Sequence, residues 1–280
     1  MWWISRSRSA VLGILIVGIA LLVAAIGPWI SPHPYSEQNL SFRMMPPPWT
    51  AGGNWRYPLG TDELGRCILS RIIYGTRIAF VVGGGVTLLA ASVGVILGLI
   101  SGYFGGTIDA IVMRLVDIQW SFPYLLLAIA VMAFLGTSLI NLILVMMLSN
   151  WVSYARTIRG VVISLKEQEF IIALISIGAN WPRILLRHIL PNCMAPILVL
   201  ISFNLASIIL MESALSFLGL GIQPPNTSWG AMISDARGHM YTSWWLVTFP
   251  GLALILLVLG VNQLGDGLRD LLDPRLRGVL

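Results

Sequence analysis

Charged residues are scarce in this sequence, and their scarcity excludes a soluble globular protein. Only 10% of the 280 residues are charged, whereas 57% are apolar and the mean hydropathy is +0.85. A soluble domain carries about a quarter charged residues, which cover its water-facing surface. Lipid must therefore cover much of this chain. The sequence predicts an all-α integral membrane protein, and its net charge of +5 does not indicate a nucleic-acid partner.

Cysteine and the motifs of catalysis are also missing. The two cysteines, Cys67 and Cys193, are far apart and form no CxxC pair, which argues against a disulfide framework and a thiolate metal site. The histidines His33, His188 and His239 are scattered, and HExxH, GxSxG and Walker-type GxxxxGK[ST] sequences are absent. We therefore expect a chain that is not a membrane enzyme and binds no metal or cofactor of its own.

Ionisable residues are nearly absent from the long apolar runs. Glu212, near one end of the fifth run, comes closest. An ion-driven carrier usually keeps acids or histidines at mid-membrane depth, so their absence argues against a secondary carrier or channel. Two interpretations of Glu212 are open. The favoured one is a hydrogen bond to a neighbouring helix end, and the other is contact with a cationic substrate group near the outer mouth.

Six apolar runs are candidates to cross a bilayer, which needs about 20 residues per helix. The fourth run is short and contains Ser149, Asn150 and Ser153. Only residues 136–138 separate the third run from the fourth, which indicates a tight helical hairpin. The six predicted spans are roughly 10–30, 78–101, 118–135, 139–153, 195–215 and 244–264.

The distribution of Arg and Lys predicts the orientation. With the N-terminus in the cytoplasm, 11 of the 17 basic residues lie on the cytoplasmic side, as the positive-inside rule favours. Both termini are therefore predicted to be cytoplasmic. The first run lacks an A-x-A cleavage site, so we expect an uncleaved helix rather than a signal peptide. The 11 residues are Arg6, Arg8, Arg114, Arg156, Arg159, Lys166, Arg183, Arg187, Arg269, Arg275 and Arg277.

Small residues recur at every fourth position of the second run, among them Gly94, Gly98 and Gly102. On a helix this spacing makes a smooth ridge that another backbone can approach closely. The ridge indicates packing against a helix of the same chain, which we favour, or an interface with another subunit.

The segment between the fourth and fifth runs, residues 156–192, is long for a connection inside a helical bundle. Its first helical piece is predicted to run from near residue 161 to residue 177. Gly178 then follows as a suitable left-handed cap.

A second helical piece is predicted after this glycine. Asn180 is a candidate N-cap, with Pro182 in the first turn, where its missing N–H has no consequence. Arg183 and Arg187 share one face of this piece, and Pro191 is expected to close it.

The stretch 170–177, FIIALISI, is apolar in seven of eight positions but too short to span a bilayer. An apolar surface outside the membrane needs cover. Two alternatives have equal weight on periodicity alone: the stretch packs beneath the chain's own membrane helices, or it docks in a groove of a separate protein.

The same segment resembles the EAA loop of ABC-type importer permeases, in which E-A-A is followed by three residues, a glycine and later Leu-Pro. Ala173 matches the middle alanine, Gly178 the glycine, and 190–191 the closing Leu-Pro. Ile172 stands where the family usually has Glu, and Leu174 where it has the second Ala. These departures remove a charge and add bulk at the expected docking surface.

The rest of the chain is similar to the C-type subunit of the peptide/nickel importer permeases, with Cys67 where that branch commonly has Asp. The resemblance implies a type I ABC importer permease architecture. Residues 1–77 would hold the N-terminal tail, first helix and long extracytoplasmic segment, and 78–280 the core with its coupling loop 156–192. The matching stretches are 58–75, 102–109, 121–129, 212–225, 229–230 and 264–277.

The resemblance also implies partners. A homologous permease would complete the translocation path in a bacterial inner membrane, two ATP-binding subunits would hold ATP and Mg²⁺, and an extracytoplasmic solute-binding protein would deliver the substrate. Peptides are the implied cargo, with nickel chelates or glutathione as alternatives. Closure of the ATPase pair would move 170–187 as a rigid lever. The implied coupling residues are Glu169, Phe170, Ala173, Gly178, Pro182, Arg183, Arg187, Leu190 and Pro191.

The long outer segment 31–77 is rich in helix breakers and ends in an amphipathic stretch from residue 62. It is predicted to cap the helix ends or, as the resemblance implies and as we favour, to form with 219–241 a landing surface for the binding protein. The tryptophans near the outer helix ends are candidate interfacial anchors, above all Trp244 and Trp245.

Overall fold

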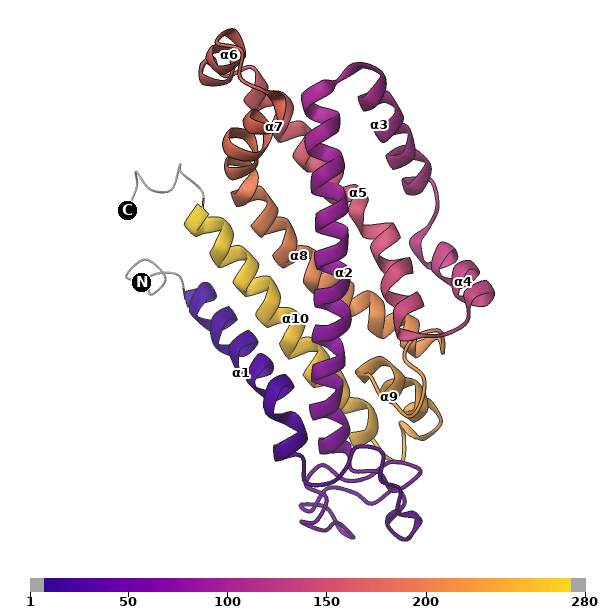
Figure 1. Ribbon diagram of the computed structural model, residues 1–280. Coiled ribbons are helices and arrows are strands. Elements are labelled where there is room, and N and C mark those ends of the chain that lie inside the picture. Colours follow the sequence, from indigo (N-terminus) through magenta and orange to yellow (C-terminus); the bar gives the residue numbers. More distant parts are fainter. Residues whose placement is uncertain (1–7, 273–280) are drawn as a thin grey trace.

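The computed structural model describes residues 8–272, which form helices joined by irregular segments (Figure 1). Within this part of the chain, strand-like pairing is limited to one isolated bridge between Thr61 and Cys67. The helices are α1 (Arg8–Ile30), α2 (Ile68–Phe104), α3 (Gly106–Trp120), α4 (Tyr124–Leu135), α5 (Leu139–Lys166), α6 (Glu169–Ser176), α7 (Trp181–Ile184), α8 (Leu190–Phe217), α9 (Trp229–Asp235) and α10 (Trp245–Leu272), with short helical turns η2 (Leu40–Phe42), η3 (Leu185–Ile189) and η4 (Ala236–His239).

Five helices are long and apolar enough to cross a membrane, namely α1, α2, α5, α10 and the continuous helix that contains α8. A sixth candidate is the pair formed by α3 and α4, which meet at a bend of 87°. The predicted all-α membrane architecture is therefore confirmed, and six spans result when this pair counts as one broken span.

The third predicted span, 118–135, is wrong as a continuous helix. The chain leaves α3 at Trp120 and enters α4 at Tyr124. Pro123 stands between them, and a proline both lacks an N–H and disfavours helical geometry in the residue before it. The sequence predicted one continuous span here because the residues on both sides of the break are apolar.

Four other predicted spans were too short, since the helices cover residues 68–104, 139–166, 190–217 and 245–272. Helix α5 continues from residue 153 to Lys166, because its polar side chains bond within the helix, as Asn150 Nδ2 donates to the Met146 carbonyl at 2.7 Å. The loop helix predicted over 161–177 is wrong for the same reason, since the break falls at residues 167–168. Helix α2 begins at Ile68 rather than 78, in a turn whose apolar side is buried.

The long helices α2 and α5 pack with their backbones in close approach. A Cβ atom added to Gly94 would lie 2.3 Å from the Trp151 carbonyl oxygen, and one added to Gly102 would lie 2.7 Å from Val162 Cβ. Gly98 meets the carbonyl oxygen of Ala155 in the same way, at 2.7 Å. The glycine ridge of α2 thus lies against α5 of the same chain.

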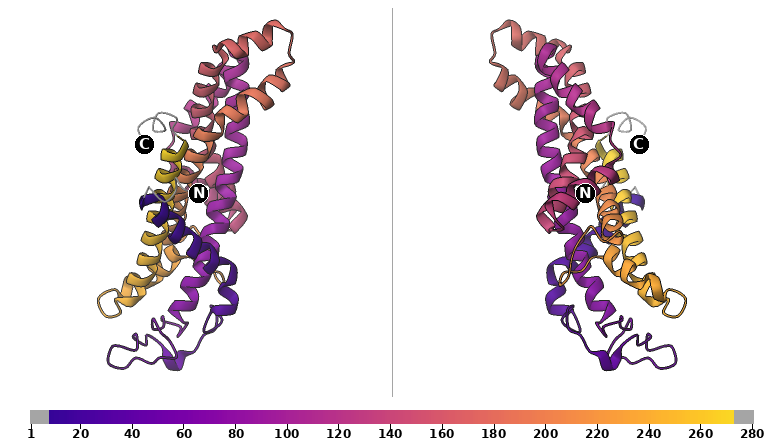
Figure 2. Two further views of the ribbon diagram at one scale, coloured as in Figure 1. Left: turned by 90° about the vertical axis from the view of Figure 1, so that its left-hand side faces the viewer. Right: turned by 90° about the vertical axis from the view of Figure 1, so that its right-hand side faces the viewer.

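The two ends of the bundle differ (Figures 1 and 2). At one end, α6 and α7 protrude as a helical loop beyond the long helices. At the other end, the segment between α1 and α2 forms an irregular layer beside α9. The long helices connect these ends, so a shift at one end has a rigid route to the other.

We expect Gly94→Ala to lower the free energy of unfolding by about 1–3 kcal/mol, because the new methyl group overlaps the α5 backbone. Gly84 is the matched control, since it lies on the same helix with nothing within 4 Å of its Cβ direction. There the better helix propensity of alanine should leave stability unchanged or raise it by up to about 1 kcal/mol. Thermal unfolding of the two purified variants in one detergent tests this, and equal midpoints would contradict the packing argument.

Candidate functional site

A sharp turn joins α6 to α7 in the protruding loop. Gly178 has a φ of +78°, its N–H donates to the Ile175 carbonyl at 2.9 Å, and the N–H of Ala179 donates to the Leu174 carbonyl at 3.0 Å. This pair of bonds is a Schellman motif, which needs a left-handed residue at the glycine position. The left-handed cap expected at Gly178 is therefore present. Asn180 precedes α7 as expected, although its side chain makes no capping hydrogen bond.

One face of the loop packs on the bundle. Ile171, Ile184 and Leu185 are buried in a cluster with Ile158 of α5 and its neighbours. Leu174 is partly buried in the same cluster, so part of its side chain packs on the chain's own helices. The stretch 170–177 reaches this cluster because one side of its short helix faces the bundle and the other side faces away from it.

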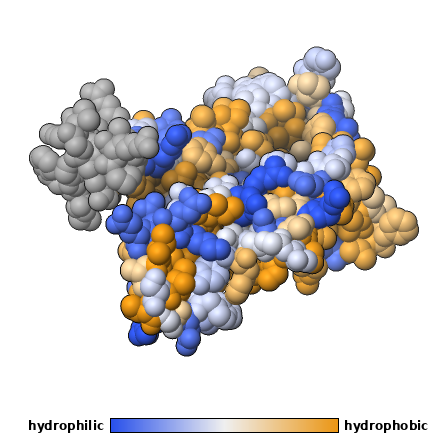
Figure 3. Space-filling view, turned by 90° about the horizontal axis from the view of Figure 1, so that it is seen from above, coloured by the Kyte–Doolittle hydropathy of each residue, from blue (hydrophilic) through white to orange (hydrophobic). Residues whose placement is uncertain are grey.

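The opposite face of the loop is apolar and uncovered by any described part of the chain. Ile177 is 79% exposed at the tip. Seen from this end of the molecule, apolar and polar patches lie side by side (Figure 3). Such a surface marks an interaction site when it lies outside the membrane. Its large exposed side chains are Phe170, Ile172, Ile175, Ile177, Trp181 and Leu186.

A hollow of about 570 Å³ lies beside the tip of the loop. Arg183 and Arg187 line it together with Pro182 and residues 177–180, so the two arginines do share one surface. Glu169 and Ala173 are exposed on the preceding helix, and Glu169 lies in its first turn, where a carboxylate favours the helix dipole. The loop therefore presents an apolar face beside a basic hollow.

Pro191 does not close the second loop helix, which corrects the sequence prediction. The chain runs from α7 through the π-helical turn Leu185–Ile189 into Leu190 and α8, and Trp181–Phe217 passes as one span. A proline ring clashes with the carbonyl four residues earlier, and the wider π-helical turn accommodates it. A displacement of the loop is therefore transmitted directly to α8.

The inner end of α5 is tied to the turn between α2 and α3. Arg159 donates two hydrogen bonds to Asp109 at 2.5 Å, and Ser101 donates to the same carboxylate. Lys166 Nζ donates to the Tyr103 carbonyl at 2.6 Å. Sequence reasoning missed these contacts, because 50 positions separate Asp109 from Arg159 and nothing in the pattern pairs them.

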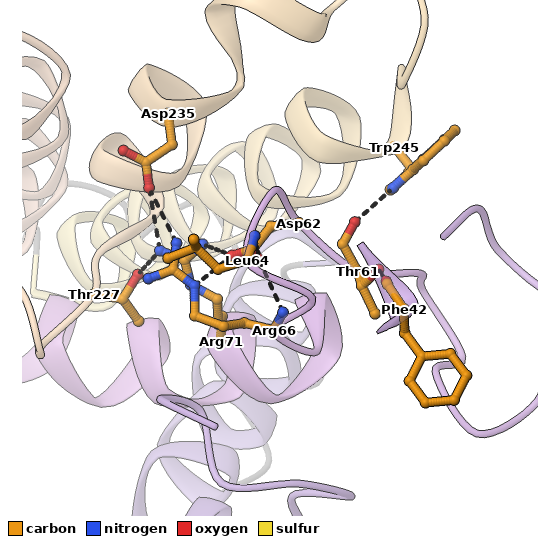
Figure 4. A network of polar contacts seen from close by, with 9 residues as sticks. All are labelled: Phe42, Thr61, Asp62, Leu64, Arg66, Arg71, Thr227, Asp235 and Trp245. Carbon is orange, nitrogen blue, oxygen red and sulfur yellow. Dashed lines mark hydrogen bonds and ion pairs between the residues drawn. The ribbon is translucent and has the colours of Figure 1, made fainter. Parts of the chain in front are cut away.

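A polar network joins the outer segment to the loop around α9 (Figure 4). The Asp62 carboxylate accepts from Arg66 Nε at 2.6 Å and from Arg71 Nη1 at 2.5 Å. Arg71 Nη2 also donates to Thr227 at 3.0 Å and to Asp235 at 3.4 Å. Arg71 and Asp62 are only 4% and 5% exposed, so their charges depend on these partners. This network fixes the two outer segments as one unit.

Indole groups add to the same junction. Trp245 Nε1 donates to the Thr61 carbonyl at 3.3 Å, and Trp229 Nε1 donates to the Ile72 carbonyl at 3.1 Å. Both rings are buried, so the interfacial-anchor interpretation is wrong for Trp245, whereas Trp244 is partly exposed. The Trp229 N–H thus meets a carbonyl in the first turns of α2, and the Trp245 N–H meets one in the segment before α2, rather than a headgroup.

Glu212 lies near the end of α8 that leads toward α9 and is 2% exposed. Ser216 Oγ donates to it at 2.6 Å, and Ser213 Oγ lies 3.4 Å from its other carboxylate oxygen. Ser216 Oγ also accepts from the Ile222 N–H at 3.1 Å, which closes the turn after α8. The carboxylate thus has local hydrogen-bond donors on its own helix.

Two candidate interaction surfaces therefore lie at opposite ends of the bundle. Within residues 8–272 no group of three or more His, Cys, Asp or Glu could hold a metal ion. Three residues used to predict the orientation, Arg6, Arg275 and Arg277, lie outside the described residues.

Comparison with known families identifies two matching regions. Residues 94–278 match the model of the binding-protein-dependent transport system inner membrane component. Residues 2–47 match the N-terminal transmembrane domain of oligopeptide transport permease C. The first match includes the protruding loop and the α9 side of the polar network, whereas residues 62–71 of that network lie between the two matching regions.

Relatives extend the match over the whole chain. The dipeptide transport system permease protein DppC of Haemophilus influenzae is 43% identical over 276 residues, 99% of this chain and 94% of the relative. The di/tripeptide transport system permease protein DppC of Pseudomonas aeruginosa is 40% identical over 98% of this chain and 90% of the relative. A solved structure of the MetNI methionine ABC transporter, in an inward-facing conformation, shares the fold with a TM-score of 0.56 and 18% identity, covering 74% of this chain and 96% of that one.

We expect Asp62→Asn to lower the free energy of unfolding by about 3–5 kcal/mol, because it leaves the Arg66 and Arg71 guanidinium groups with only the more distant and half-exposed carboxylate of Asp235. Asp117→Asn is the control, since it breaks the exposed ion pair with Arg156. We expect this variant to lower the free energy of unfolding by less than about 0.5 kcal/mol. Thermal unfolding of both variants measures the difference. Equal stability would mean that the outer network does not hold the two segments together.

Proposed function

The chain belongs to the family of inner membrane components of binding-protein-dependent transport systems, and on that basis we propose that it translocates peptides as one permease subunit of an ABC importer. Its relatives are named as permease proteins of transport systems, so the chain is a non-catalytic, multi-pass membrane subunit and ATP hydrolysis belongs to partner subunits. ATP and Mg²⁺ would accordingly be held by those partners.

The proposed cargo is di- and tripeptides. Support comes from the two relatives named above, which match this chain over nearly its whole length. Nickel chelates and glutathione, the alternatives drawn from the family resemblance, have no comparable support among these relatives. A homologous permease is proposed to complete the path.

The exposed apolar face of α6 and α7 is the observation that carries the coupling proposal. We propose that it seats in a groove of an ATP-binding subunit, with Arg183 and Arg187 at the rim. Because Trp181–Phe217 is one continuous helix, the lever extends beyond residue 187 into the membrane. Closure of two ATP-binding subunits would then tilt α8 and open or close the path.

The proposed orientation places the α6–α7 loop and both termini in the cytoplasm of a bacterial cell. The basic residues of the loop and of the inner end of α5 support this assignment. The outer segment and the α9 loop, held together by Arg71, then face the solute-binding protein. Their shared network makes them a rigid landing surface.

Ile177→Asp tests the coupling surface. The variant should reduce peptide uptake and co-purification of the ATP-binding subunits by about tenfold or more, because a carboxylate would be desolvated at the interface. Leu40→Asp is the matched control for co-purification, since Leu40 is 68% exposed at the other end of the molecule, away from the proposed ATPase site. Retained ATPase binding in Ile177→Asp would contradict the docking site.

Gly178→Asp provides a second test of the same loop. No atom lies within 4 Å of its Cβ direction, so the variant acts through the left-handed backbone and the new charge rather than through a clash. We expect transport to be abolished with normal membrane abundance of the chain. Intact ATPase-coupled uptake in this variant would refute the role of the turn.

The substrate proposal is tested by uptake of a radiolabelled dipeptide into cells whose other peptide importers are deleted. Uptake should require this chain and a functional ATP-binding subunit. Uptake of a nickel chelate or glutathione instead, with no dipeptide transport, would contradict the peptide assignment.

A further inference from the structure

A hollow of about 430 Å³ lies where the end of α1 meets the first turns of α2. Ala24, Gly27 and Pro28 of α1 and Ile73 of α2 give it apolar walls. The residues that follow α1, 31–35, complete its lining. We call this space the α1–α2 hollow. It is separate from the polar network around Arg71, because neither Arg71 nor its partners line it.

The α1–α2 hollow lies at the depth where lipid headgroups meet hydrocarbon. Arg8 is the one charged residue of α1, so the rest of this helix suits the hydrocarbon layer up to its last turn at the hollow. Trp29 in that turn is 81% exposed, and exposed indole groups favour the boundary between lipid and water. Helix α2 joins α1 at the same level, since a Cβ atom added to Gly27 would lie 2.7 Å from Ile73 Cγ2.

Arg77 brings a positive charge to this depth. It lines the hollow four residues after Ile73, about 6 Å further along α2 toward the membrane centre. Its exposed side chain makes no ion pair or hydrogen bond with any residue in 8–272. Arg71 of the same helix differs, because Asp62 and Asp235 accept from it. A guanidinium group at the edge of the hydrocarbon layer pairs with an anion or reaches the headgroups, so Arg77 is placed to bind an anion from outside the chain.

The outer wall of the hollow is held in place by contacts of its own. The His33 backbone N–H donates to Ser70 Oγ at 3.2 Å. Tyr35 stacks on Tyr74 of α2, with ring centroids 3.7 Å apart. The Tyr74 hydroxyl in turn donates to Asn226 at 2.8 Å, which joins this wall to the segment before α9. The hollow is therefore formed in advance, and a ligand would bind without ordering the turn.

The chemistry of the lining favours a phosphate ester with an apolar tail. None of the described residues that line the α1–α2 hollow is acidic, and Arg77 carries a fixed positive charge among them. Ser31 adds a hydroxyl group to the same lining. A phosphate accepts charge-assisted hydrogen bonds from a guanidinium and a further bond from a hydroxyl. The ammonium group of a zwitterionic headgroup would find no carboxylate in the lining.

A second, apolar hollow of about 340 Å³ lies deeper along α1. Ala20 and Val23 of α1 line it together with Leu257 of α10. The two hollows reach α1 at consecutive residues, because Val23 lines the deeper one and Ala24 lines the α1–α2 hollow. A hydrocarbon chain that follows α1 from the first hollow would therefore meet further apolar surface.

We propose that an anionic glycerophospholipid binds in the α1–α2 hollow, with its phosphate on Arg77 and Ser31 and an acyl chain along α1. In the proposed orientation this lipid belongs to the outer leaflet. It would fill the space between α1 and α2 and support the turn that joins α1 to the outer segment. The inference goes beyond peptide translocation and holds for any cargo, because it depends only on the depth of α1 and α2 in the membrane.

Site-specific photolabelling of the assembled transporter tests this inference. A phosphatidylglycerol with a diazirine in its acyl chain should label residues 24–35 and 73–77, as mapped by peptide mass spectrometry. Arg77→Gln should reduce this labelling by at least about fivefold, because the phosphate loses its cation. Arg77→Lys should retain most of it, since lysine keeps the charge. Arg43→Gln is the matched control, because Arg43 is exposed in the outer segment and does not line the hollow.

A second pair of variants tests the space rather than the charge. Ala24→Trp should fill the α1–α2 hollow and reduce labelling of the same residues by at least about fivefold, because the lipid and the indole cannot share this volume. Ala25→Trp is the control, since Ala25 is exposed on the same helix and lines neither hollow. Co-purification of the partner subunits with each variant shows that the transporter still assembles.

Competition experiments identify the ligand. Unlabelled phosphatidylglycerol should suppress labelling of the hollow at least about fivefold better than phosphatidylcholine. Equal suppression by the two lipids would reject the preference for an anionic headgroup. Equal suppression by sn-glycerol 3-phosphate, which has no acyl chains, would show a site for free phosphate esters and overturn the lipid assignment. Unchanged labelling in both Arg77→Gln and Ala24→Trp would overturn the site itself, whatever the result of the peptide uptake assay.

Discussion

The close approach of α2 and α5 is the constraint on which the rest of the molecule depends. Both helices extend well past the apolar length of a span, and the glycine ridge lets them touch along their inner halves. The outer end of α2 carries Arg71 and its network, whereas the inner end of α5 carries Arg159 and leads into the protruding loop. This pair of helices therefore sets the distance and direction between the two candidate interaction surfaces. The two surfaces share no residues. Only the long helices between them can therefore transmit a movement from one surface to the other.

Movement between these surfaces has a second rigid route through α8. The π-helical turn at Leu185–Ile189 lets the chain pass Pro191 without ending the helix, so loop and span form one body. The same span carries Asn204, which donates to Ser153 of α5, and Glu212, which lies near the α9 end of the helix. A tilt that starts at the loop would reach both places. The loop is thus better described as the free end of a membrane helix than as a separate lever.

The sequence was sufficient for the class of protein, for most spans and for the turn at Gly178, because each depends on local composition or on one backbone conformation. It was insufficient where distant residues decide. Asp62, Arg71 and Asp235 form one network only after folding brings them together, and their spacing in the chain carries no signal of it. The helix break at Pro123 and the helix that continues through Pro191 show the same limit of prediction from sequence. One proline stands at a break between two helices, and the other stands in a helix that continues past it after a π-helical turn.

The network around Arg71 also ties a stretch that lies between the two family matches to a stretch inside the main match. The N-terminal model ends at residue 47 and the main model begins at 94, while the network joins residues 62–71 to 227 and 235. A graft that exchanged the N-terminal third between two related proteins would pair one ancestor's guanidinium with another's carboxylate. Recombination inside this chain is therefore restricted, and the two regions are expected to be inherited as a unit.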